Sequence, residues 1–321
     1  MQAINKTSPA PRYSGESWLT AAQSIANRIR LRVLEHTLRH RGGYMSQACS
    51  SAEMFAALYT QMMNLGLVIP PIMPPPFNGV AGARNPRYQS GGYYNGPQGP
   101  HYDRFILSPA QYALILYATL VEVGRMDPDG MTQFNQDGGT VEMIGAEHSP
   151  GMEVMTGSLG QGLSQGAGIA MARKRRGESG RVWLMMSDGE FQSGQNWEAV
   201  QAAGFHRLDN LWAIVDMNGQ QCDGAVTTVM TLEPLAQRLT AFGARVITID
   251  GHDLKALAAT TKVSSEGQPT IILAYTDPCR GLPLLEKRIP KLHYLRFIDS
   301  AEFATYEAFY QNIRSEWGGT N

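Results

Sequence analysis

The chain has 321 residues, 43% of them hydrophobic, and a formal net charge of −1. Its length allows one large domain or two small ones with a full hydrophobic core. The near-zero charge argues against nucleic acid or an anionic membrane as partner, and no apolar run is long enough to span a bilayer. The amino terminus does not resemble a signal peptide, and three scattered cysteines favour a reducing cytoplasm.

The residue pattern of the amino-terminal third predicts a flexible arm, two helices and a long loop. Residues 1–15 are polar and predict a flexible arm, and residues 16–321 predict a single domain. Apolar spacing predicts a helix over 16–41, ended by two glycines, and a second helix capped by Ser50 with Glu53 as capping-box partner. Residues 67–101 are rich in Pro, Gly, Tyr and Asn. Such a loop is either a surface excursion or an ordered cover for an active site or a partner chain.

The rest of the chain alternates between buried strands and helices. This pattern predicts an α/β fold, a doubly wound and mostly parallel sheet flanked by helices. Residues 103–117 are expected to form a short strand, a turn and a helix that opens near Pro109. Further strands are expected near 181–186, 211–215, 244–249 and 269–275, and further helices near 163–173, 195–205, 232–242 and 302–317.

Two polar residues follow neighbouring predicted strands at their carboxyl ends. Asp188 follows the strand at 181–186, and Asn218 stands thirty positions later, after the strand at 211–215. Open α/β sheets bind ligands at this edge. A carboxylate, an amide oxygen and a backbone carbonyl suit Mg²⁺ or Ca²⁺, which in turn suits a phosphate, and Gly189 allows close approach of an anion.

This spacing resembles the signature of thiamine-diphosphate enzymes, and the flanking residues resemble the amino-terminal, diphosphate-binding half of transketolase. The resemblance implies that Asp188, Asn218 and the carbonyl of Gln220 hold the metal. The segment Thr156–Gly162 resembles the family's Thr-Gly-x-Leu-Gly-Gln-Gly, which touches the cofactor rings. The cofactor-binding residues implied are Gln111, Gly157, Ser158, Leu159, Ser187, Asp188, Gly189, Glu190, Asn218 and His252.

Two histidines are candidates for catalysis by the same resemblance. His252 belongs to Asp-Gly-His-Asp, where the family histidine reaches the diphosphate and the substrate. His293 lies in a segment where a family histidine approaches the active site. An exposed loop histidine is the competing interpretation of His252. His148, in the region of a family substrate histidine, is more often a surface residue.

Several positions depart from the family pattern. Tyr44 and Gln111 stand where transketolases have histidine; Gln111 can donate a hydrogen bond to phosphate but cannot shuttle a proton. Ser187 replaces a glycine, which is tolerable if the turn does not need a positive φ. Ser193 replaces a glutamate that pairs across the dimer near the cofactor. We interpret Glu190 as a charge at a helix amino terminus and not as a substitute for that family glutamate.

The resemblance implies one half of a split transketolase. A separate subunit would supply the pyrimidine domain, giving an α2β2 assembly that moves a two-carbon ketol unit between sugars or sugar phosphates. Two alternatives stay open. One is an acyl transfer to a carrier arm, as in 2-oxoacid dehydrogenases, and the other is a catalytically silent regulatory subunit that binds the cofactor.

Overall fold

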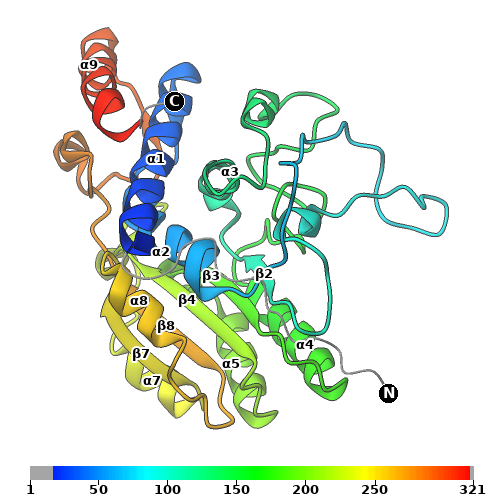
Figure 1. Ribbon diagram of the computed structural model, residues 1–321. Helices are drawn as coiled ribbons and strands as arrows, with labels where there is room; N and C mark the ends of the chain where they lie inside the picture. The colour runs from blue at the N-terminus through cyan, green and yellow to red at the C-terminus, as the bar shows by residue number, and fades with distance from the viewer. Residues whose placement is uncertain (1–16, 319–321) are drawn as a thin grey trace.

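A parallel five-stranded sheet forms the centre of the molecule (Figure 1). The computed structural model describes residues 17–318, so the arm predicted at 1–15 lies outside the described residues. The strand order is β2-β3-β4-β8-β7, and every neighbouring pair is parallel. The strands are β2 (Arg104–Leu107), β3 (Val182–Ser187), β4 (Leu211–Met217), β7 (Arg245–Asp250) and β8 (Thr270–Tyr275).

Alternating side chains of the strands supply a hydrophobic core on each face of the sheet. Trp183 and Met185 of β3 join one core, and Leu184 and Met186 join the other. Side chains of successive strand residues point to opposite faces, so a run of apolar residues buries both. The first core is covered by α1 (Ser17–Arg39), α2 (Met45–Ala57), α3 (Ala113–Glu122), α8 (Leu254–Thr260) and α9 (Ser300–Trp317). The second is covered by α4 (Gly162–Arg175), α5 (Gly194–Phe205) and α7 (Leu235–Ala241). This is the doubly wound α/β fold that the sequence predicts.

The prediction of a capping box at Ser50 and Glu53 is wrong. The helix α2 begins at Met45, and both residues lie buried inside it. Ser50 donates its hydroxyl to Asp216 at 2.5 Å, and Glu53 accepts from Arg30 of α1. Both side chains therefore bond to residues of other elements. In the predicted capping box they would instead have bonded to backbone N–H groups at the start of their own helix.

A two-stranded ribbon holds the carboxyl-terminal part of the chain against the start of α2. In it β1 (Gly42–Gly43) pairs antiparallel with β9 (Leu295–Arg296). A Cβ atom at Gly43 would lie 2.5 Å from the hydroxyl of Thr37, so only glycine fits there. The ribbon brings Tyr44 and His293, which are far apart in sequence, into edge-to-face contact at 5.4 Å between ring centroids.

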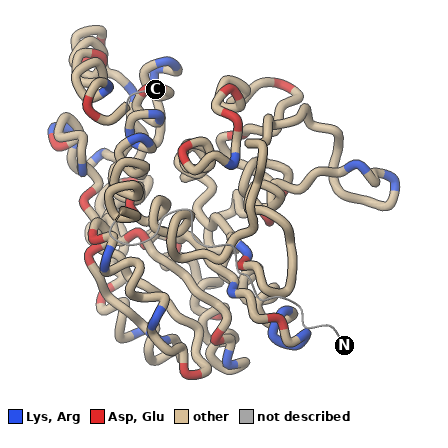
Figure 2. Tube along the Cα trace, viewed as in Figure 1, with Lys and Arg blue, Asp and Glu red and all other residues tan. Residues whose placement is uncertain are grey.

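Residues 67–101 form an extended, largely irregular segment, part of which projects from the body as a loop (Figure 1), whereas the 3₁₀ helix Gly91–Asn95 is mostly buried. The loop is partly ordered by burial of Tyr94, whereas Tyr93 is half exposed. Arg84 and Arg87 in this segment are exposed, and Figure 2 shows basic residues in the projecting loop. The segment is therefore partly ordered, and its roles as a cover for an active site or as a contact for a partner chain remain predictions.

Two further expectations concern the membrane and the cysteines. None of the helices between residues 17 and 318 combines the length and apolar character needed to cross a bilayer. Cys49, Cys222 and Cys279 are all free thiols.

Candidate active site at the carboxyl edge of the sheet

The loops that follow β3 and β4 meet at the carboxyl edge of the sheet. The Asp188 side chain, directly after β3, accepts hydrogen bonds from the backbone N–H of Gly189 at 2.7 Å and of Gly219 at 2.8 Å. Since Gly219 follows Asn218, the structure brings together the two loops that carry the predicted metal ligands. The side chain of Asp188 is buried, 2% exposed.

The turn after β3 is built around a buried glutamate. Ser187 caps a short 3₁₀ helix, Asp188–Gln192, and forms a capping box with Glu190, as predicted for a charge at a helix amino terminus. Glu190 also accepts from the hydroxyl of Ser108 at 2.6 Å and from the N–H of Gly160 at 3.4 Å. Glu190 therefore ties β2, β3 and the glycine-rich segment together. Ser187 has φ of −116°, so the serine is tolerated there.

A second buried carboxylate, Asp216, lies at the end of β4 and was not singled out from the sequence. It accepts from Ser50, Tyr112, Asn218 and Thr276, each from a different segment. A sequence signal existed, because an aspartate inside an apolar parallel strand must find partners. Asp216 also precedes Asn218 by two residues, which is the spacing of one face of a strand.

The electrostatics of this edge favour a cation. Burial, and then the neighbouring charge of Asp216, raise the pKa of Asp188 to about 7. Burial also raises the pKa of Asp216 and of Glu190. Among residues 17–318, no Lys, Arg or His side chain forms an ion pair with any of these carboxylates. A bound divalent ion would supply the missing positive charge.

Two of the buried polar side-chain atoms that lack a hydrogen-bond partner follow Asn218 directly in the chain. The side-chain oxygen of Gln220 and the side-chain nitrogen of Gln221 are buried and have no hydrogen-bond partner. Both belong to β5 (Gln220–Gln221), which forms a small ribbon with β6 (Gly224–Ala225). A Cβ atom on Gly189 would lie only 3.2 Å from Gln221, so glycine allows this close approach.

The donor set of Asp188, Asn218 and the Gln220 carbonyl fits Mg²⁺ or Ca²⁺. Within the described part of the chain, no group of three or more His, Cys, Asp or Glu side chains could hold a metal ion, so the candidate ligand set depends on an amide and a backbone carbonyl beside one carboxylate.

The glycine-rich segment that precedes α4 forms an open rim beside this edge. Gly157, Ser158 and Leu159 are exposed, and Leu159 is 45% exposed. Met155 and Ile144 are also exposed apolar side chains, at 58% and 47%. Ile144 packs near Gly157, since a Cβ atom there would lie 3.1 Å from it. The rim thus presents apolar surface that the described chain does not cover.

Gln111 lines a small cavity of about 180 Å³. It precedes Tyr112, whose hydroxyl bonds to Asp216 at 2.7 Å, so Gln111 lies near the acidic edge. Aromatic and imidazole rings make much of the cavity wall, together with apolar side chains. The lining residues are His36, His40, Gly42, Gly43, Tyr44, Gln111, Leu114, Phe134, Asn135, Met143 and Tyr294.

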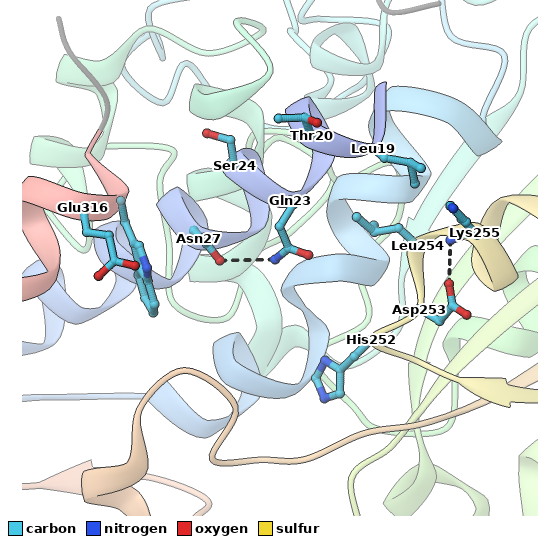
Figure 3. Close-up of a pocket in the computed structure, with 11 residues that line it drawn as sticks. Leu19, Thr20, Gln23, Ser24, Asn27, His252, Asp253, Leu254, Lys255 and Glu316 are labelled. Atoms are coloured by element: carbon cyan, nitrogen blue, oxygen red, sulfur yellow. Dashed lines mark hydrogen bonds between the residues drawn. The ribbon is translucent and has the colours of Figure 1, made fainter. Parts of the chain in front are cut away.

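His252 is held by hydrogen bonds at both ring nitrogens. Its Nε2 accepts from the backbone N–H of Asp277 at 2.9 Å, so in the neutral ring Nδ1 carries the proton and donates to Glu53 at 3.0 Å. Glu53 is buried and also bonds to Arg30. His252 makes no hydrogen bond to the turn after β3 or to Asn218. It lines a different cavity of about 600 Å³ between α1, the start of α8 and the end of α9 (Figure 3). This geometry does not show His252 in the site around Asp188, and its catalytic role remains a prediction.

The other two histidines lie outside the acidic edge as well. The backbone carbonyl of His293 accepts from Gln47 at 2.9 Å, and burial lowers the pKa of its ring. His148 pairs with Glu142 at 3.1 Å and packs against Phe77 of the projecting loop. His293 therefore lies beside Tyr44, which lines the same cavity as Gln111, and His148 contacts Phe77 of the segment 67–101.

Comparison with known proteins identifies relatives over most of the chain. Residues 92–288 match the family model described as transketolase, thiamine diphosphate binding domain. The transketolase family protein y4mO of Sinorhizobium fredii is 40% identical over 206 residues, covering 63% of this chain and 73% of the relative. Human transketolase is 30% identical over 271 residues, covering 84% of this chain and 39% of its own length.

Solved structures show the same fold. The crystal structure of transketolase from Campylobacter jejuni superimposes with a TM-score of 0.70 at 21% identity, over 93% of this chain and 48% of that one. The chain thus spans less than half the length of the human and Campylobacter jejuni transketolases, but 73% of the length of y4mO.

Proposed function

The chain belongs to the transketolase family, and from this membership we propose that it binds thiamine diphosphate through a divalent metal and transfers a two-carbon ketol unit between sugars or sugar phosphates. One observation carries the proposal. The buried carboxylate of Asp188 sits against the loop of Asn218, beside a second buried carboxylate and without a cationic side-chain partner. That arrangement suits a metal-held phosphate.

The residues of this edge have separate tasks in the proposed site. Asp188, the amide oxygen of Asn218 and the carbonyl of Gln220 hold the metal. Gln111 donates its amide hydrogens to a phosphate oxygen, and Gly157, Ser158 and Leu159 lie against the cofactor rings.

The turn Ser187–Gly189 and Glu190 fix the position of Asp188. When bound, the cofactor would supply a nucleophile for the ketose carbonyl and an electron sink for breaking the C–C bond next to that carbonyl.

We propose that a separate pyrimidine-domain subunit completes the site, with two copies of each chain. The exposed apolar side chains of Ile144, Met155 and Leu159 support this, since they form an uncovered rim at the proposed cofactor position. The free thiols are in keeping with a cytoplasmic complex.

A catalytically silent subunit is the second candidate. It is favoured by Gln111, which cannot exchange a proton, and by His252, whose nitrogens are both bonded within the chain. In that case the chain would bind the cofactor and regulate a partner. Introducing Gln111→His together with Ser193→Glu separates the two, because only a silent complex would gain activity from them.

The test is co-purification of the full chain with its partner, followed by a screen of ketose and aldose phosphates with thiamine diphosphate and Mg²⁺. The proposal predicts two-carbon transfer that depends on both additions and is lost in Asp188→Ala. A complex that binds the cofactor but turns over no sugar in this screen would contradict the transferase proposal.

A further inference from the structure

The carboxylate of Asp216 is the centre of a buried network at the end of β4. The residue is 0% exposed. Its Oδ2 accepts from Ser50 Oγ at 2.5 Å, Tyr112 Oη at 2.7 Å and Asn218 Nδ2 at 2.9 Å. Its Oδ1 accepts from Thr276 Oγ1 at 2.5 Å. The donors come from α2, the turn before α3, the loop after β4 and the loop after β8, so one side chain joins four segments of the carboxyl edge.

The network accounts for both amide hydrogens of Asn218. One goes to Asp216 Oδ2, and the other goes to the hydroxyl oxygen of Tyr112 at 3.1 Å, with the hydroxyl of Ser50 as a more distant acceptor at 3.5 Å. Tyr112 accepts this bond because its own hydrogen is already donated to Asp216. The amide nitrogen of Asn218 is thus directed inward, and Oδ1 is left to accept from the N–H of Gln220 at 2.9 Å.

The opposite orientation of the Asn218 amide is excluded by the same geometry. Turning the amide over would place its oxygen at the position of Nδ2, 2.9 Å from the carboxylate oxygen of Asp216. Two acceptors would then face each other, and both hydrogen bonds of the amide nitrogen would be lost. Asp216 and Tyr112 therefore decide which end of Asn218 faces away from the core.

We infer that Asp216 is a positioning residue, which, with Tyr112, holds the amide oxygen of Asn218 ready to bind the divalent cation. The inference rests on the proposed function, because it assigns the task of a network behind the proposed metal ligands. Asp216 acts through Asn218: three donors crowd Oδ2, which leaves that oxygen no room for a cation. Partners behind a metal ligand of this kind commonly change metal affinity when they are replaced.

The test exchanges the two side chains. Mn²⁺ binding to the full chain is measured by electron paramagnetic resonance with thiamine diphosphate present. Asp216→Asn removes an acceptor for the Asn218 amide, and Asn218→Asp sets two carboxylates against each other. Each single variant should weaken Mn²⁺ binding by about tenfold or more. The double variant, which restores an amide facing a carboxylate, should bind within about threefold of the wild-type chain.

Thr276→Val is the matched control, since it removes a hydrogen bond from the other oxygen of Asp216 and leaves Asn218 untouched. It should keep Mn²⁺ affinity within about threefold even where it lowers thermal stability. Asp216→Asn binding as tightly as the wild type, Thr276→Val binding as weakly as Asp216→Asn, or a double variant no better than the singles would overturn the inference.

A metal-free measurement separates this inference from the proposed function. In ¹⁵N spectra of the chain without metal, the side-chain amide of Asn218 should be protected from exchange, lose that protection in Asp216→Asn and keep it in Thr276→Val. An unprotected amide in the wild-type chain overturns the positioning role. A protected amide in a chain that takes up no Mn²⁺ would leave the orientation intact and contradict the proposed metal site.

Discussion

Three buried acids follow the central strands, and their partners separate their roles. Glu190 is satisfied by a capping box and by Ser108, and Asp216 by four side-chain donors. Asp188 has only backbone N–H partners. Asp188 is therefore the acid of this edge that retains acceptor capacity for a metal ion.

His252 gives a prediction at the scale of one residue. His252→Ala leaves the N–H of Asp277 without its partner and removes one donor from Glu53. We expect the free energy of unfolding to fall by about 1–3 kcal/mol, measured by urea denaturation. Thiamine diphosphate affinity decides the role. An unchanged affinity marks His252 as structural, and a large loss of affinity at unchanged stability would instead support direct contact with the cofactor.

Sequence reasoning proposed those candidate site residues whose chemistry shows in local spacing, and the structure places their loops side by side. Asp188 and Asn218 each follow an apolar strand, and the parallel sheet places such residues at one edge. The network around Asp216 was missed, because Ser50, Tyr112 and Thr276 are brought to it by three different elements. Their bonds depend on how α2 and α3 pack on the sheet, and no local pattern encodes that packing.

At the scale of elements, α1 carries a buried histidine that makes stability depend on pH. Burial, and then the nearby His40 and Arg39, lower the pKa of His36 from 6.5 to about 3. The unfolded chain therefore binds a proton that the folded chain does not. Stability from this group is fully present above pH 6.5 and is lost as the pH falls toward 3, by up to about 1.4 kcal/mol per pH unit.

The corresponding experiment compares urea unfolding of the wild type and His36→Phe between pH 7.5 and pH 4.5, a range set by the shift above. Phenylalanine keeps an aromatic ring against Phe134, which His36 meets at 4.4 Å between centroids. The variant should lose less stability than the wild type on acidification, with the two curves parallel at neutral pH. Equal losses over the whole range would show that His36 does not set this dependence.

The strands and long helices were predictable because their apolar periodicity survives in the fold. The start of α2 could not be predicted, because it depends on the pairing of the preceding β1 with β9, which is distant in sequence. Gly42 and Gly43 pair with Leu295 and Arg296, and α2 begins directly after Tyr44. A ribbon of two residues per strand leaves no periodic signal, so the sequence predicted a stop at the glycines but placed the next helix too late.

At the scale of the whole molecule, the carboxyl edge of the sheet is both the proposed site and the proposed surface for a second subunit. Exposed apolar residues gather on the glycine-rich rim next to Gly157. Phe205 is 81% exposed but ends α5, which runs back from the carboxyl edge toward the start of β4. A substitution on the rim and a substitution at Phe205 therefore distinguish an interface at the carboxyl edge from one at the opposite edge of the sheet.

We expect Ile144→Lys to abolish co-purification of the proposed pyrimidine-domain subunit and Phe205→Lys to preserve it. Both side chains are exposed, so neither variant should change the thermal midpoint of the isolated chain by more than a few degrees. Pull-down from cells that express both subunits is the measurement. Retention of the partner by Ile144→Lys, or its loss in both variants, would place the interface elsewhere.

The central claim is that Asp188 holds a divalent ion that in turn holds the diphosphate of the cofactor. Calorimetric titration of thiamine diphosphate into the complex, with and without Mg²⁺, tests it most directly, with Asp188→Asn as the variant and Asp223→Asn, an exposed acid of the neighbouring ribbon, as the control. The account predicts uptake that requires Mg²⁺, is weakened by about tenfold or more in Asp188→Asn and is unchanged in Asp223→Asn. Equal uptake without Mg²⁺, or equal affinity in Asp188→Asn and the wild type, would contradict it.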